Sequence, residues 1–130
     1  MIPIAWNTTA MNDQTKAQSV KAGRSATFNI MIQNDGSATD SFTVQANGSS
    51  AGFTVRYYTG ISGGTEITTP VTAGGYTVSN LGPGANQVIR AVVTVARGIA
   101  SGTVKDCLVT SRSVADNLKR DAVKARVTVN

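Results

Sequence analysis

The feature that most constrains this chain is a two-residue period at positions 26–33, Ala-Thr-Phe-Asn-Ile-Met-Ile-Gln. Ala, Phe, Ile and Ile alternate there with Thr, Asn, Met and Gln. Because successive side chains of an extended chain point to opposite sides, this period predicts a β-strand with one buried face. The stretch ends at Asn-Asp-Gly-Ser, residues 34–37, whose side chains suit a tight turn. A second alternating stretch follows at 40–46. We therefore predict a β-hairpin over residues 26–46.

Further strand patterns continue to the end of the chain. In the last of them Val123, Ala125, Val127 and Val129 alternate with polar residues and are predicted to face inward. Seven to nine strands at this spacing predict an all-β fold, an immunoglobulin-like two-sheet antiparallel β-sandwich without substantial helix. We expect residues 1–13 to form an N-terminal arm or first strand and residues 14–130 to form the sandwich. The additional strand candidates are 16–20, 53–58, short pieces around Ile67 and Val71, 76–79, 88–95, 103–111 and 122–129.

The residue inventory argues against an enzyme. The chain has no histidine, which removes the commonest general base and zinc ligand. Its single cysteine, Cys107, lies in an apolar strand pattern, so we expect a buried thiol without reactivity. Asn34, Asp35 and Asp40 could offer oxygens to calcium, but their spacing matches no calcium loop and the local glycine also suits a turn. We predict no catalytic residues, no metal site and no cofactor.

Positive charge is concentrated in the C-terminal part of the chain. Residues 1–84 hold four basic and four acidic residues, whereas residues 85–130 hold eight basic and three acidic ones, which accounts for the net charge of +5. The sequence therefore predicts a basic interaction face that includes Arg90, Lys124 and Arg126 and would meet an acidic partner. A solvated surface is the alternative. A nucleic-acid partner is not favoured, because no aromatic residues interleave with these basic residues to form a stacking platform.

Several turns and strand starts, taken in order, carry a resemblance to a known family. They are Val-Lys-Ala-Gly at 20–23, Ala-Thr-Phe at 26–28, Gln-Asn-Asp-Gly-Ser-Ala-Thr-Asp-Ser-Phe at 33–42, Leu-Gly-Pro-Gly at 81–84, Val-Val-Thr-Val at 92–95, Ser-Val-Ala-Asp at 113–116 and Asp-Ala-Val-Lys-Ala at 121–125. This succession resembles the immunoglobulin-like repeats of large bacterial and archaeal surface proteins, including the CARDB-type cell-adhesion-related domains. The resemblance implies a non-enzymatic, extracytoplasmic repeat module and carries no site residues.

Three functions follow as hypotheses. The first is a spacer, adhesion or protein-interaction module of a secreted or cell-surface prokaryotic protein, whose partners are other modules or cell-surface glycans. The second is a filament or surface-layer subunit that lends an N-terminal arm, Ile2, Ile4 and Trp6, to the sheet of another copy, although the same alternation also suits an ordinary first strand. The third is a carbohydrate-binding module of a secreted hydrolase with Tyr58 as glycan platform. No segment approaches the twenty apolar residues of a membrane helix, so membrane insertion is not expected.

Overall fold

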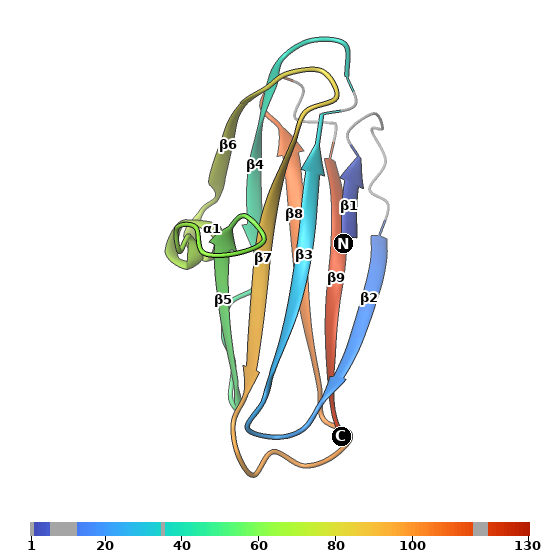
Figure 1. Ribbon diagram of the computed structural model, residues 1–130, viewed down its shortest axis with the longest axis vertical. Helices are drawn as coiled ribbons and strands as arrows, with labels where there is room; N and C mark the ends of the chain where they lie inside the picture. The colour runs from blue at the N-terminus through green and yellow to red at the C-terminus, as the bar shows by residue number, and fades with distance from the viewer. Residues whose placement is uncertain (1, 6–12, 35, 116–119) are drawn as a thin grey trace.

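The computed structural model describes residues 2–5, 13–34, 36–115 and 120–130 of the chain. Within these residues nine strands and one short helix follow one another (Figure 1). They are β1 (Ile2–Ala5), β2 (Asp13–Val20), β3 (Ser25–Gln33), β4 (Asp40–Ala46), β5 (Phe53–Thr59), α1 (Thr68–Ala73), β6 (Tyr76–Leu81), β7 (Asn86–Val95), β8 (Val104–Ser113) and β9 (Arg120–Val129).

The strands form two sheets that pack face to face. One has four strands in the order β1-β3-β7-β5, and the other has five in the order β2-β9-β8-β4-β6. The predicted immunoglobulin-like β-sandwich is therefore confirmed, and so is its strand number. The pairing is antiparallel with two exceptions among the described strands, because β1 runs parallel to β3 and β2 runs parallel to β9.

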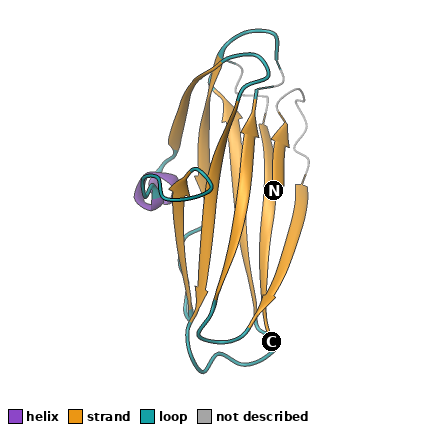
Figure 2. Ribbon diagram, viewed as in Figure 1, coloured by secondary structure: helices purple, strands orange, loops and turns teal. Residues whose placement is uncertain are grey.

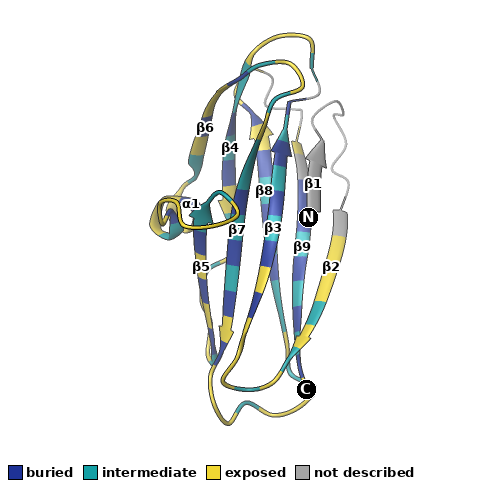
Figure 3. Cartoon of the chain, in the orientation of Figure 1, coloured by how far each residue is buried: buried dark blue, intermediate teal, exposed yellow. Residues whose placement is uncertain are grey.

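The core lies between the sheets and is filled by the alternating positions of the strands (Figure 3). On β3, Phe28, Ile30 and Ile32 are buried, and on β9 every second residue from Val123 to Val129 is buried, as the sequence predicts. Small and β-branched side chains dominate because the chain has few aromatic residues. Burial of one face of each strand is what sets the register of both sheets.

The predicted hairpin over residues 26–46 is wrong, although both of its strands exist. β3 pairs with β1 and β7, whereas β4 pairs with β6 and β8 in the other sheet. The connection is an arch between sheets, and buried Asn34 explains why. Its side-chain amide donates to the carbonyl oxygens of Ala38 and Leu81, both at 2.8 Å, and its Oδ1 accepts from the Gly36 N–H at 2.9 Å. These bonds hold the chain in a crossing that a tight two-residue turn could not make.

The strand candidate around Val71 is also wrong, since this residue lies in α1 beside β5 (Figure 2). Ile67 and Val71 are four residues apart and both buried, at 3% and 1% exposure, and the Val71 N–H donates to the Ile67 carbonyl. That spacing places two apolar side chains on one side of a helical turn. The helix has six residues, so the predicted absence of substantial helix holds among the described residues.

Candidate functional site

The outer face of the five-stranded sheet carries four of the C-terminal basic residues. Its β8 and β9 present Arg112, Arg120, Lys124 and Arg126 at outward-facing positions, and Asp106 of β8 lies on the same face. Arg126 and Asp106 are register partners, and the guanidinium donates from Nε to Oδ1 at 2.8 Å and from a terminal nitrogen to Oδ2 at 3.1 Å. This two-point bond holds the pKa of Asp106 below its usual range. The charge of Arg126 is therefore already matched.

Arg112 and Arg120 form a different kind of pair. They lie directly opposite each other on β8 and β9, both are exposed, and among the side chains that the structure describes neither forms an ion pair with a carboxylate. Like charges at directly opposed positions of a sheet repel each other and destabilise it. Two cationic side chains at such positions attract an anion.

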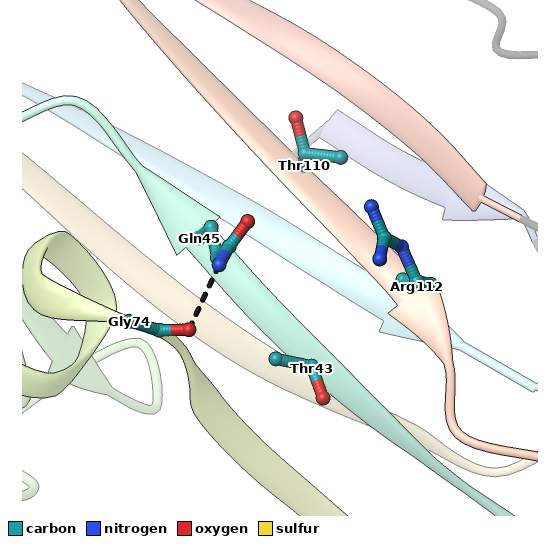
Figure 4. A pocket seen from close by; sticks show the side chains of 5 residues that line it. All are labelled: Thr43, Gln45, Gly74, Thr110 and Arg112. Atoms are coloured by element: carbon teal, nitrogen blue, oxygen red, sulfur yellow. Dashed lines mark hydrogen bonds between the residues drawn. The ribbon is translucent and has the colours of Figure 1, made fainter. Parts of the chain in front are cut away.

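A polar hollow of about 240 Å³ adjoins Arg112 (Figure 4). Thr43 and Gln45 project from β4 beside Thr110 and Arg112 of β8, and Gly74 closes the side next to α1. The Gln45 side-chain amide donates to the Gly74 carbonyl at 2.8 Å, which fixes that wall. The lining offers hydroxyl groups, an amide oxygen and a guanidinium, and it contains no large apolar side chain.

Arg90 belongs to the opposite surface of the sandwich. It lies on β7, where its guanidinium donates to the carbonyl oxygens of Gly60 and Gly63 at 3.1 and 2.8 Å and covers the ring of Tyr58 at 4.7 Å from the ring centre. This cation–π contact and the two bonds hold the glycine-rich loop after β5 against the sheet. One face of the Tyr58 ring is thus occupied by Arg90, which leaves less of it for a sugar to stack on.

The structure thus separates the predicted basic residues. Lys124 and Arg126 share one outer face, whereas Arg90 is on the other sheet. The sequence alone does not single out Arg112 and Arg120. Alternation along each strand predicts that both face outward. That they lie opposite each other becomes clear only from the register of β8 and β9.

The N-terminal residues occupy a sheet edge of their own chain. Ile2 and Ile4 lie in β1, in register with Ile30 and Ile32 of β3. Trp6 lies outside the described residues. The pairing agrees with an ordinary first strand of the same chain.

The remaining candidates for chemistry have structural partners. Asp40 accepts from the N–H groups of Ser41 and Ala115 at 2.7 and 3.1 Å and from the Ser113 hydroxyl, which ties the end of β8 to β4. Asp35 lies outside the described residues, and among the others no group of three potential metal ligands is present. Cys107 is fully buried, as predicted, and burial raises the pKa of its thiol.

Solved structures with this fold include an enzyme and an adhesin. A family 123 glycoside hydrolase from Clostridium perfringens aligns with 90% of this chain at a TM-score of 0.57 and 9% identity, and the CupB6 tip adhesin from Pseudomonas aeruginosa aligns with 98% at a TM-score of 0.54 and 13% identity. The chain spans 23% of the first protein and 43% of the second. At these identities the likeness establishes the fold alone. No protein-family model matches the chain, and no curated protein matches it in sequence.

Proposed function

We propose that this chain is a non-enzymatic structural and adhesion module of a secreted or cell-surface prokaryotic protein, and that it acts as a spacer or protein-interaction domain under tension. The resemblance to CARDB-type repeats supports this proposal, and so does the fold shared with a bacterial tip adhesin. No helix among the described residues has the length and hydropathy to cross a membrane. The observation that carries the proposal is the parallel pairing of β2, the second strand, with β9.

β2 and β9 run side by side in the same direction along the long axis of the sandwich (Figure 1). Their register extends without a break from Asp13 opposite Ala122 to Val20 opposite Val129. A force that pulls the start of β2 away from the end of β9 therefore acts along both strands in opposite directions. All hydrogen bonds of the ladder share that load, because the bonds of a parallel pair are evenly spaced. This geometry suits a module that transmits tension between its neighbours.

The test compares two pulling directions in the same protein. Cysteine handles at Thr15 and Asn130 load the β2–β9 ladder in shear, whereas handles at Val104 and Asn130 pull the adjacent ends of β8 and β9 and break their pairs one after another. Thr15, Val104 and Asn130 are exposed, and native Cys107 is buried, so the handles are selective. Single-molecule force spectroscopy should give a clearly higher unfolding force in the first direction. Equal forces would remove the argument for a tension-bearing spacer.

A second candidate function is self-assembly by strand exchange. β1 has only four residues and forms an edge of the four-stranded sheet in parallel pairing, which is slightly weaker per residue than antiparallel pairing. The β1 strand of another copy could take its place in the same register. Light scattering after size exclusion should then show concentration-dependent polymers that disappear when residues 1–10 are deleted. Assembly that persists in the truncated chain would exclude exchange through β1.

A further inference from the structure

We infer that the outer face of the five-stranded sheet binds an acidic polysaccharide, with a uronate carboxylate held between Arg112 and Arg120 and the sugar seated in the adjoining hollow. This inference extends the proposed function, since it names the class of partner for the surface module. Its two arginines lie outside the β2–β9 register, which begins at Ala122, so the two proposals can fail separately.

The arginine pair supplies the affinity for a carboxylate. The two guanidinium groups face outward from directly opposed positions, and neither pairs with a carboxylate whose side chain the structure describes. Lys124 follows on the same face of β9 and extends the positive surface. A carboxylate between the arginines would relieve their repulsion and accept charge-assisted bonds from both, which is the geometry that guanidinium groups favour. Asp106 does not compete, because Arg126 already binds both of its oxygens.

The hollow favours a sugar over a protein segment. Its lining residues are Thr43, Gln45, Gly74, Thr110 and Arg112, whose hydroxyl, amide and guanidinium groups are the kinds that hydrogen-bond to a saccharide. Stable protein interfaces have an apolar core, and the lining contains no large apolar side chain. At about 240 Å³ the hollow is smaller than a site for a drug-sized ligand, which suits a single sugar unit of a longer chain.

The experiment measures binding of the full chain to alginate, a polyuronate, by calorimetry, with neutral dextran and polyglutamate as the other probes. We expect binding to alginate that weakens with added salt, and none to dextran. Arg112→Gln and Arg120→Gln should each weaken it about tenfold, the factor typical of a lost charged hydrogen bond. Thr110→Val should weaken it severalfold. The control is Arg97→Gln, which removes the same charge from the turn after β7 and should leave binding unchanged.

Each other outcome overturns the inference. Loss of alginate binding in Arg97→Gln equal to that in Arg112→Gln would mean that net charge alone attracts the polymer. Polyglutamate binding with the same dependence on the two arginines would assign the surface to an acidic protein instead. Unchanged alginate binding by Thr110→Val would exclude the hollow as the sugar site. Neither arginine variant should lose stability, because each removes a repulsive neighbour, so a folding defect will not obscure the result.

Discussion

The buried side chain of Asn34 offers a direct test of why the connection between β3 and β4 crosses from one sheet to the other. Asn34 is 2% exposed, and its three side-chain hydrogen bonds join the connection between β3 and β4 to the end of β6. Asn34→Ala removes all three. Asn34→Asp keeps an acceptor for the Gly36 N–H but directs a carboxylate at two carbonyl oxygens, those of Ala38 and Leu81.

The magnitude follows from the burial of each bond. The bond to the Leu81 carbonyl is buried, so its loss costs about 1–3 kcal/mol, whereas the two bonds within the loop can be replaced by water and cost about 0.5 kcal/mol each. Asn34→Ala should therefore lower the free energy of unfolding by about 2–4 kcal/mol. For a domain whose total stability is about 5–15 kcal/mol, this is a large fraction.

Urea unfolding followed by far-ultraviolet circular dichroism measures the change. With a slope of about 2 kcal/mol/M, the midpoint of Asn34→Ala should fall by about 1–2 M at unchanged slope. Asn34→Asp should be at least as unstable at neutral pH, and the difference should shrink in acid, where the protonated carboxyl group regains a donor. A loss below about 1 kcal/mol in Asn34→Ala, or a milder effect of Asn34→Asp at neutral pH, would refute this account of the crossing.

Three further predictions concern other parts of the chain. Burial and its raised pKa should keep the Cys107 thiol from reacting with a disulfide reagent until the protein unfolds, and fast labelling under native conditions would contradict this. The Asp106–Arg126 pair stabilises the fold above the unfolded pKa of Asp106, and this contribution is lost as the pH falls through the lower folded pKa. Asp106→Asn should therefore cost less than about 1 kcal/mol at pH 7 and nothing in strong acid, as urea titrations across pH will show. Gly64→Ala should cost at least about 2 kcal/mol, because φ is +76° and the new Cβ would collide with a carbonyl oxygen at the end of β5. Gly63→Ala, at φ +60° in open space, should lower the free energy of unfolding by only about 1 kcal/mol in the same assay. Equal losses in the two variants would mean that the loop moves to avoid the collision at residue 64.

The strands and their buried faces could be predicted because they depend on local alternation. Residues 40–46 and the inward positions of β9 agree with the structure for this reason. Pairing partners could not be predicted in the same way. The sequence near residue 34 does not distinguish a hairpin from a connection that crosses to the other sheet. The buried hydrogen bond that decides between them joins the Asn34 side chain to the Leu81 carbonyl, far along the chain. The α1 helix did leave a local signal in the four-residue spacing of Ile67 and Val71, within a stretch punctuated by glycine and proline.

The candidate site shows the same division. An excess of positive charge after residue 85 is visible in the sequence, and the outward parity of Lys124 and Arg126 follows from alternation. Which cations remain uncompensated depends on register, because β8 and β9 place Asp106 opposite Arg126 and leave Arg112 opposite Arg120. Arg90 could not be separated from the others without knowing that β7 belongs to the opposite sheet.

The ladder between β2 and β9 also determines when the chain can fold on the ribosome. Among the strands that the structure describes β2 pairs with β9 alone, so residues 13–20 must wait until residues 122–129 have been made. Contacts this distant in sequence close slowly, because the entropy of the intervening loop is lost before the pairing forms. Until β9 has emerged, β8 and β2 each expose an unpaired edge, and such edges are prone to pair with other chains. The nascent chain should therefore depend on chaperones until synthesis has passed residue 129.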